Sequence, residues 1–390
     1  RHTRYISVTG VQTCALPILV KVELPGRGDD TRQWGPPFVK NPDGSDSRES
    51  AYYLCCNRNK RSITVDIAHK EGAALVRRLA AEADVLVENF KVGGLAKYGL
   101  DFPALKTVNP RLVYCSITGF GQDGPYADRP GYDFVAQGMG GFMSVTGEEG
   151  GRPLRAGVAM ADLSTGNMAV ISILMALRHA ERTGKGQQID LSLLDTQIAM
   201  MANQASSYLI SGRVPGLSGN RHPTVVPYTT YDCADGVLIV AVGNDGQFRA
   251  LCSEMGRPEL SDDARFATSA ARMANRDEIE AIVAGMVKDF TREALITRLV
   301  AAGVPAGPVN TMADVFADPF VRARGVVHRF VRDDGVEIPS VAFPAKLSTT
   351  PAQYLQEPPR LGEHTAQALQ DWLDLGPGEL DALAGTGALG

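Results

Sequence analysis

The 390-residue sequence lacks a basic excess, a regular cysteine spacing and a long apolar run. Its net charge of −5 and its pI near 5.8 argue against a nucleic-acid-binding protein, which normally presents a basic surface. The six cysteines match neither a disulfide framework nor a zinc site, so we expect reduced thiols in a cytoplasmic protein. The longest apolar run, Met168 to Leu177 with one Ser, is far shorter than a bilayer span, and we expect no membrane contact.

Several common catalytic motifs are also missing. The one complete G-x-G-x-x-G lies in residues 385–390, where no helix can follow to hold a pyrophosphate. There is no G-x-x-x-x-G-K-[ST] and no G-x-S-x-G, and the histidines have no metal-ligand spacing. These absences disfavour a nicotinamide oxidoreductase, an ordinary NTPase and an α/β-hydrolase, and we expect no bound metal.

The first eighteen residues differ in character from the rest of the chain. The segment 8–18, VTGVQTCALPI, looks like a translated sequencing-library adapter. A genuine leader is the alternative, but the segment has neither a basic-then-apolar signal pattern nor an amphipathic Arg-rich pattern. We therefore expect residues 1–18 to be a foreign segment and the fold to begin at Leu19.

Strand and helix patterns alternate after Leu19. LVKVE (19–23) reads as a buried strand, and apolar residues at helical spacing precede a second strand, DVLVE (84–88). Another helix near 103–108 leads into the strand of RLVYCSITGFG. This alternation predicts an α/β fold with a Rossmann-like parallel sheet, whose ligands bind beyond the carboxyl ends of the strands.

The second half of the chain predicts a smaller domain. Two long helices are expected at about 163–183 and 190–210. From about residue 222, the sequence pattern predicts hairpins and short helices instead. The hairpins turn at Asp235-Gly236 and Asp334-Gly335. The expected domains are a large one over 19–221, a small α+β one over 222–325, and a C-terminal segment over 326–390 that returns to the large one.

One carboxylate stands at the start of the most apolar helical stretch, AGVAMADLSTGNMAVISILMAL (156–177). Asp162 can act as an N-cap, which stabilises a helix by about 1 kcal/mol. It can also act as a nucleophile, since a helix N-terminus lowers the pKa of a carboxylate and keeps it ionised. The glycine-rich stretch before it contains Tyr132, Asp133 and Gln137, and this stretch reads either as a site-forming loop or as a surface connection.

A series of motifs resembles the class III (CaiB/BaiF type) CoA-transferases. The motifs run in order from about Leu19 to His364: VKVELPGRGDDTRQWGPPF, NRNKRSITVDI, VENFKVGGLAKYGL, YCSITGFGQDGPYADRPGYDFVAQ, GVAMADLSTGNMA, GKGQQIDLSLLD, GVPAGPVNTMADVFADP and PRLGEHT. Within the family, the chain is most similar to the succinyl-CoA:dicarboxylate transferases that act on glutarate or hydroxymethylglutarate.

The resemblance implies a transferase that moves CoA from an acyl-CoA donor, here succinyl-CoA, to a carboxylic acid. It implies that Asp162 attacks the thioester and passes through an anhydride and an aspartyl-CoA thioester, with Tyr132 and Asp133 beside the reacting acyl group. A carboxylate suits this role because its acyl adducts retain group-transfer energy. CoA is then a substrate, and no metal or redox cofactor is implied.

The resemblance also implies contacts to CoA from Asn89, Phe90 and Lys97. Further candidate contacts are Arg32, Lys60 and Arg61, for which solvated surface charge is the alternative. Leu24 replaces an arginine that the formyl-CoA branch places near the CoA phosphates. The resemblance therefore does not say which residues bind the phosphates in this chain. One of Arg129, Arg152 and Arg155 can pair with the distal carboxylate of a dicarboxylate acceptor, or all three are surface residues.

Two other activities are alternatives. A 2-methylacyl-CoA racemase needs a second acid or base, and a phenol with a pKa near 10, such as that of Tyr132, serves poorly at pH 7. A CoA-binding chain without catalytic activity is the other, because the first strand and helix of the family are replaced by the adapter-like segment. The resemblance further implies an interlocked homodimer with the active site at the contact between protomers.

Overall fold

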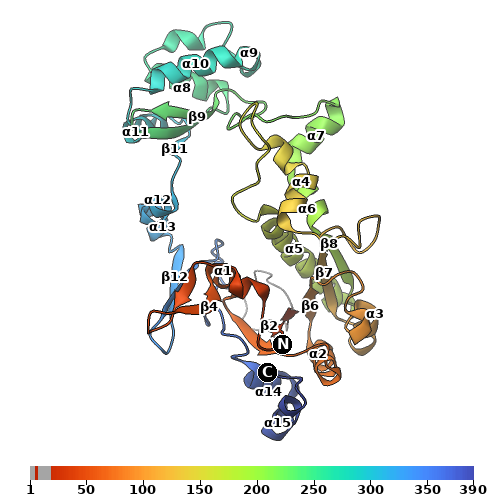
Figure 1. Cartoon of the computed structure of the whole chain (residues 1–390). Helices are drawn as coiled ribbons and strands as arrows, with labels where there is room; N and C mark the ends of the chain where they lie inside the picture. The colour runs from red at the N-terminus through yellow and green to blue at the C-terminus, as the bar shows by residue number, and fades with distance from the viewer. Residues whose placement is uncertain (1–4, 8–18) are drawn as a thin grey trace. The chain divides into compact units, whose positions relative to one another are not determined.

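The computed structural model describes residues 5–7 and 19–390, and these fall into two compact units (Figure 1). The first unit runs through Phe142 and also comprises 156–211 and 322–390, and the second comprises 143–155 and 212–321. The stretch 143–155 joins the second unit, where the carbonyl of Gly147 accepts the N–H of Gly219 at 2.9 Å. The second unit therefore begins before the expected boundary at residue 222.

A parallel six-stranded sheet forms the first unit, in the order β5–β2–β1–β6–β7–β8. The strands are β1 (Tyr5–Ser7), β2 (Leu19–Glu23), β5 (Lys60–Thr64), β6 (Val85–Glu88), β7 (Val113–Thr118) and β8 (Gln188–Ser192). The α/β class and the parallel sheet predicted from the sequence are thus confirmed. The expected start of the fold at Leu19 is not, because the short β-prone segment β1 pairs with both β2 and β6. The adapter origin expected for residues 1–18 otherwise lies outside the described residues.

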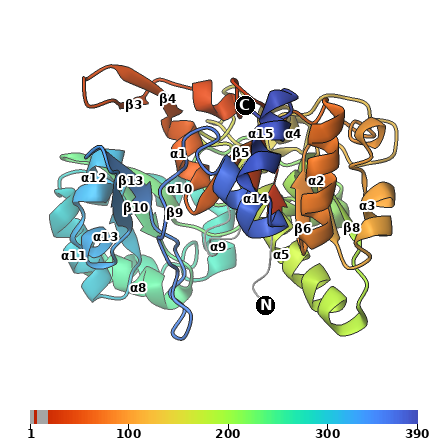
Figure 2. The same cartoon turned by 90° about the horizontal axis from the view of Figure 1, so that it is seen from below.

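Both faces of the sheet are covered, and the central strands β6 and β7 are largely apolar and buried. The covering helices are α2 (Lys70–Glu82), α3 (Phe102–Val108), α5 (Met160–Thr183) and α14 (Thr365–Leu373). In β7, Val113 and Cys115 pack with α5, whereas Tyr114 between them belongs to the core on the side of α2 and α14. Figure 2 shows α2 and α14 lying over this second face.

The rest of the first unit consists of hairpins and short helices. The strands are β3 (Phe38–Lys40), β4 (Asp46–Ser50), β12 (Val327–Val331) and β13 (Glu337–Val341). The helices are α1 (Ala51–Asn57), α4 (Asp133–Met139), α6 (Leu193–Met200), α7 (Ala202–Ser211) and α15 (Pro377–Gly385). The β12–β13 pair confirms the hairpin predicted at Asp334-Gly335.

The single helix predicted at about 190–210 is confirmed only in part, because the segment begins in a strand and its helical part is divided into two helices. Residues 188–192 form β8, which pairs with β7 at the edge of the sheet, and α6 and α7 follow it. The hydroxyl of Ser192 accepts the N–H of Asp195 at 3.2 Å and begins α6 directly after the strand. No Gly or Pro separates strand from helix, so the apolar spacing of the two elements merges in the sequence.

The second unit has its own apolar core. An antiparallel sheet in the order β11–β10–β9 packs against helices. Its elements are β9 (Tyr228–Cys233), β10 (Gly236–Ala241), β11 (Ala306–Pro308), α8 (Asp245–Glu254), α9 (Ser269–Ala274), α10 (Arg276–Val287), α11 (Arg292–Ala301) and α12 (Met312–Ala317), with α13 (Pro319–Ala323) at its boundary. The predicted hairpin is confirmed, with Gly236 as the first residue of β10, and the short helices predicted for this region are confirmed as well.

Among the described residues, α5 is the one helix long and apolar enough to cross a membrane by length and composition. A single helix of this kind is weak support for a membrane span, because core helices of globular domains pass the same test. Its residues Ala169, Ile173 and Ala176 are buried against the sheet.

Candidate active site

Asp162 lies in the first turn of α5, within the first unit. The helix begins at Met160, its N-cap position is Ala159, and no side chain of that residue caps it. Asp162 is therefore not the N-cap, which corrects one of the two roles expected for it. Its side chain is exposed in the single chain, and the carboxyl group is available for a reaction.

The capping carboxylate belongs to Asp133, the first residue of α4. Its Oδ1 accepts the backbone N–H of Ala161 at 2.7 Å and that of Asp162 at 3.3 Å. These are two of the N–H groups that a helix leaves without internal partners. Tyr132, at the N-cap position of α4, makes no capping bond with its side chain and is 69% exposed. The structure thus brings Asp133 to Asp162, with Tyr132 next to Asp133 in the chain.

The Asp162 carboxyl is a weak acid for an aspartate. The Asp162 side chain reaches solvent, but the protein atoms around its carboxyl group partly bury it and reduce its hydration. This burial, together with the charge of Asp133, raises the pKa of Asp162 to about 6. The sequence led us to expect a lowered pKa from the helix N-terminus. That expectation is wrong because burial is the larger cause of the shift, while Asp133 occupies the N–H groups of the helix and adds a like charge beside Asp162.

Two further residues lie near this pair: Gln137, from the glycine-rich stretch already considered as a site-forming loop, and Tyr52, which the sequence did not mark. Gln137 is completely buried, donates from Nε2 to Oδ2 of Asp133 at 2.6 Å, and accepts the N–H of Ala156 through Oε1 at 2.9 Å. Burial raises the pKa of the Tyr52 hydroxyl on α1, and the charges of Asp162 and Asp133 add to this effect. Nothing in the sequence around Tyr52 signals that α1 lies near these charges, since Tyr52 is far from Asp133 and Asp162 in the chain.

The predicted CoA contacts after β6 lie on one loop. Asn89 and Lys97 are exposed there, and Lys97 Nζ lies 4.7 Å from the centre of the Tyr98 ring. The backbone N–H of Phe90 donates to Oε2 of Glu88 at 2.7 Å, which ties the loop to the end of the strand. Burial raises the pKa of Glu88. The loop therefore presents two exposed cations, Lys91 and Lys97, and one exposed amide beyond the carboxyl end of a central strand.

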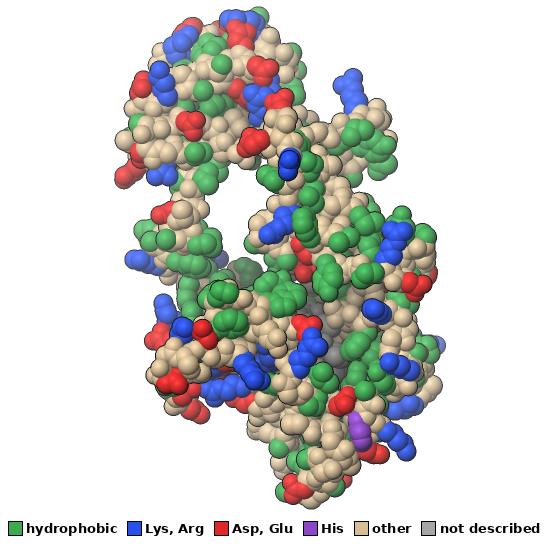
Figure 3. Space-filling model, in the orientation of Figure 1, with side chains coloured by type: hydrophobic (Ala, Val, Ile, Leu, Met, Phe, Trp, Pro, Cys, Tyr) green, Lys and Arg blue, Asp and Glu red, His purple; other side chains and the backbone are tan. Residues whose placement is uncertain are grey.

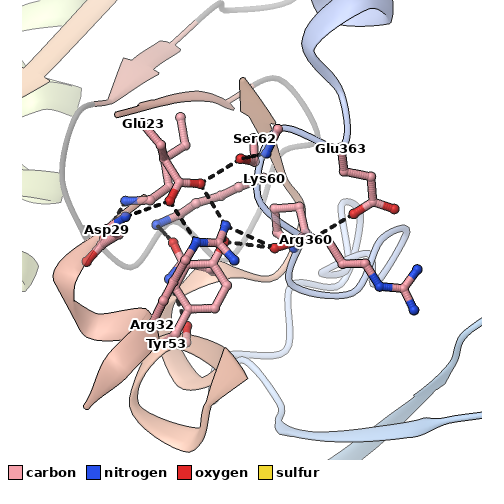
Figure 4. Close-up of polar contacts among 12 residues, drawn as sticks. Glu23, Asp29, Arg32, Tyr53, Lys60, Ser62, Arg360 and Glu363 are labelled. Atoms are coloured by element: carbon pink, nitrogen blue, oxygen red, sulfur yellow. Dashed lines mark hydrogen bonds and ion pairs between the residues drawn. The ribbon is translucent and has the colours of Figure 1, made fainter. Parts of the chain in front are cut away.

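Arg32 and Lys60 lie elsewhere, in a buried polar cluster (Figure 4). Arg32 donates from Nε and Nη2 to the two carboxylate oxygens of Glu23 at 2.8 and 2.7 Å, and from Nη2 to the Tyr53 hydroxyl at 2.6 Å. Burial opposes the charge of Glu23, yet Arg32 holds its pKa below the usual value. Lys60, fully buried, donates to Oδ1 of Asn57 at 3.0 Å. These two cations are thus not the solvated surface charges considered as an alternative.

Arg61 lies on β5, next in the chain to Lys60, and has a different environment. Its Nη1 forms an ion pair with Oδ2 of Asp371 on α14 at 2.6 Å, and both side chains are partly exposed. In the described ranges 5–7 and 19–390, no group of three or more His, Cys, Asp or Glu side chains is arranged to hold a metal ion.

Comparisons with known proteins agree with the resemblance. The family described as CoA-transferase family III matches residues 19–365. The succinate–glutarate CoA-transferase of Agrobacterium fabrum is 52% identical over 353 residues, which cover 90% of this chain and 88% of that protein. The human succinyl-CoA:glutarate CoA-transferase is 40% identical over 359 residues, covering 91% of this chain and 80% of that protein.

Solved structures share the fold. The crystal structure of a CaiB/BaiF family protein from Brucella suis has a TM-score of 0.80 at 47% sequence identity, covering 95% of this chain and 98% of that one. The structure of Rv3272 from Mycobacterium tuberculosis has a TM-score of 0.78 at 26% identity, covering 93% of this chain and 97% of that one. The chain belongs to CoA-transferase family III and is therefore an enzyme that transfers CoA.

Proposed function

We propose that this enzyme transfers CoA from succinyl-CoA to a short dicarboxylate such as glutarate, with Asp162 as the nucleophile. The observation that carries the proposal is the pair formed by Asp133 and Asp162 at the start of α5, where one carboxylate caps the helix and the other stays available. The substrates follow from the succinyl-CoA:glutarate transferases to which the chain is similar.

The reaction proceeds through covalent adducts of Asp162. Its carboxylate oxygen attacks the thioester carbonyl of the donor, the C–S bond breaks, and CoA leaves as thiolate. The thiolate then attacks the Asp162 carbonyl of the mixed anhydride and releases succinate, leaving an aspartyl-CoA thioester. The acceptor carboxylate repeats these two steps in reverse order, so that acceptor-CoA forms and the Asp162 carboxylate is restored. No metal, redox cofactor or net proton transfer is required.

The raised pKa of Asp162 suits this chemistry. A carboxylate with a pKa of about 6 is still about 90% ionised at pH 7, and it is a more basic nucleophile than an ordinary aspartate. The site needs protection from water as well, because an anhydride hydrolyses readily. Since Asp162 is exposed in the single chain, a further protein surface must cover it during the reaction.

A second copy of the chain can supply that cover. On α5, Leu174 and Met175 are 57% and 69% exposed, and on α7, Leu209 and Ile210 are 81% and 87% exposed. Figure 3 shows apolar side chains gathered over α7. Exposed apolar surface on this scale is typical of an interface. We therefore propose the interlocked homodimer, rather than a bilayer, as the environment of these helices, in a cytoplasmic enzyme, as the irregular cysteine spacing suggests.

Among the three arginines considered for the distal carboxylate, we favour Arg129. It belongs to the same compact unit as Asp162, whereas Arg152 and Arg155 belong to the other. Its guanidinium lies 3.8 Å from the centre of the Tyr126 ring, which holds the cation in one orientation. An arginine so oriented can bind a carboxylate through two N–H groups.

Trapping of the adduct tests this function. The enzyme is incubated with succinyl-CoA and no acceptor, quenched with hydroxylamine, and the peptide that contains Asp162 is analysed by mass spectrometry. We expect a hydroxamate on Asp162, and none in the Asp162→Asn variant. Glutarate added before the quench should yield glutaryl-CoA and deplete the adduct.

Two outcomes would contradict the proposal. An unmodified Asp162 with several acyl-CoA donors, in a protein that still binds CoA, would indicate binding without catalysis. Exchange of deuterium into the acyl α-carbon, with no adduct, would indicate racemase chemistry instead.

A further inference from the structure

Helix α4 holds the segment that leads to Asp162 at two points. Asp133 and Gln137 are four residues apart and therefore lie on the same face of the helix. Asp133 accepts the N–H groups of Ala161 and Asp162, and Gln137 accepts the N–H of Ala156. The two side chains are joined by the bond of 2.6 Å from Gln137 Nε2 to Asp133 Oδ2. Together they form a clamp on residues 156–162.

Within this clamp, the Gln137 side chain has both ends occupied. Its amide is completely buried, its oxygen accepts a backbone N–H, and its nitrogen donates to a carboxylate. A buried amide whose donor and acceptor are both used has one favourable orientation. In the described part of the chain, Oδ2 of Asp133 accepts its hydrogen bond from the Gln137 amide. This bond fixes the rotation of the carboxylate that caps α5.

We propose that Gln137 is a positioning residue for the reaction: it locks Asp133 on the N-terminus of α5 and thereby fixes the distance between the Asp133 charge and the Asp162 nucleophile. The inference rests on the proposed function of Asp162. Gln137 touches neither substrate nor the reacting atoms and acts through Asp133 alone. A displacement of about 1 Å in such an arrangement can cost about 100-fold in rate.

Two substitutions separate positioning from simple packing. Gln137→Met keeps the length of the side chain and removes both hydrogen bonds, and we expect kcat to fall about 10- to 100-fold with little change in KM for succinyl-CoA. Gln137→Glu restores the contact only when it is protonated, since a carboxylic acid donates O–H where the amide donated N–H. We therefore expect the kcat of this variant, as a fraction of that of the unsubstituted enzyme at the same pH, to be highest at low pH and to fall as the pH rises and two carboxylates face each other.

Gln197 offers a matched control. It is also a completely buried glutamine, it packs against Gly140 at the end of α4, and within the described ranges neither its Oε1 nor its Nε2 has a hydrogen-bond partner. Gln197→Met therefore removes an amide near α4 without breaking the clamp. We expect its kcat and its pH profile to match those of the unsubstituted enzyme.

The measurements are steady-state rates from pH 5 to 9, thermal unfolding, and hydroxylamine trapping for each variant. A selective loss of activity at high pH in Gln137→Glu, in protein that remains folded, supports positioning. Folded Gln137 variants with unchanged kcat and an unchanged pH profile would overturn the inference while the adduct still forms in the unsubstituted enzyme. Absence of that adduct in the unsubstituted enzyme would instead refute the proposed function.

Discussion

The pH dependence of the reaction follows from the environment of Asp162. Burial and the Asp133 charge raise its pKa from an ordinary 3.8 to about 6. Because only the carboxylate attacks a thioester, kcat/KM should follow the ionised fraction of Asp162 in the free enzyme. The perturbation is Asp133→Asn, which removes the charge and keeps a side-chain oxygen able to accept the N–H of Ala161.

The magnitudes are large enough to measure. With a pKa of about 6, the ionised fraction is about 90% at pH 7 and about 10% at pH 5, so kcat/KM at pH 5 should be about a tenth of that at pH 7. An aspartate with the ordinary pKa of 3.8 would lose only about 6% of its ionised form at pH 5. In Asp133→Asn the midpoint should move to lower pH but stay above 3.8, since burial is the larger cause of the shift.

The assay measures glutaryl-CoA formation at low succinyl-CoA concentration in buffers of constant ionic strength between pH 4.5 and 8. The midpoint is compared between the two proteins, because the absolute rate also changes when the cap is altered. A flat profile between pH 5 and 7 in the unsubstituted enzyme would refute the raised pKa. A midpoint that stays in place in Asp133→Asn would refute the electrostatic contribution of Asp133.

Two further predictions concern stability. Since the pKa of Asp162 is raised from 3.8 to about 6 in the folded state, its ionisation costs stability, and this cost develops between these two pH values and is complete above about pH 6. Asp162→Asn should therefore raise the melting temperature at pH 8, and calorimetry should show this difference vanish below about pH 3, where the group is protonated in both states. Arg32→Met leaves the buried carboxylate of Glu23 without its ion pair and should lower the free energy of unfolding by about 3–5 kcal/mol in urea titrations. A variant of Arg32 that is fully stable but has a much higher KM for succinyl-CoA would instead assign it to CoA binding.

The architecture of the first unit could be predicted because its signals are local. Buried strands such as β2 and β6 are short apolar runs, and the residues that end them are polar or glycine. The hairpins were predicted from Asp-Gly turns, whose chemistry is contained in two residues. β8 was missed because its five residues run directly into α6, and only its pairing with β7 distinguishes the strand from the helix.

The buried cations show where sequence reasoning ends. Arg32 and Lys60 are charged residues in polar stretches, and such residues are mostly exposed. Their burial depends on partners brought by the fold: Glu23 from the end of β2, and Asn57 from the end of α1. An ion pair between two elements leaves no periodic trace in a single sequence. The same holds for Tyr52, whose proximity to Asp162 depends on the placement of α1 within the unit.

The two roles considered for Asp162 are divided between two residues. A carboxylate that caps a helix accepts backbone N–H bonds, and those bonds withdraw the electron density that a nucleophile needs. Asp133 accepts the N–H groups of Ala161 and Asp162, so the Asp162 carboxyl group is not needed to accept hydrogen bonds from the first turn of α5. Burial is the larger cause of the raised pKa of Asp162, and the negative charge of the cap raises this pKa further. The residue that stabilises the helix thus also makes Asp162 more basic, and this coupling explains why a site built on one carboxylate needs a second one beside it.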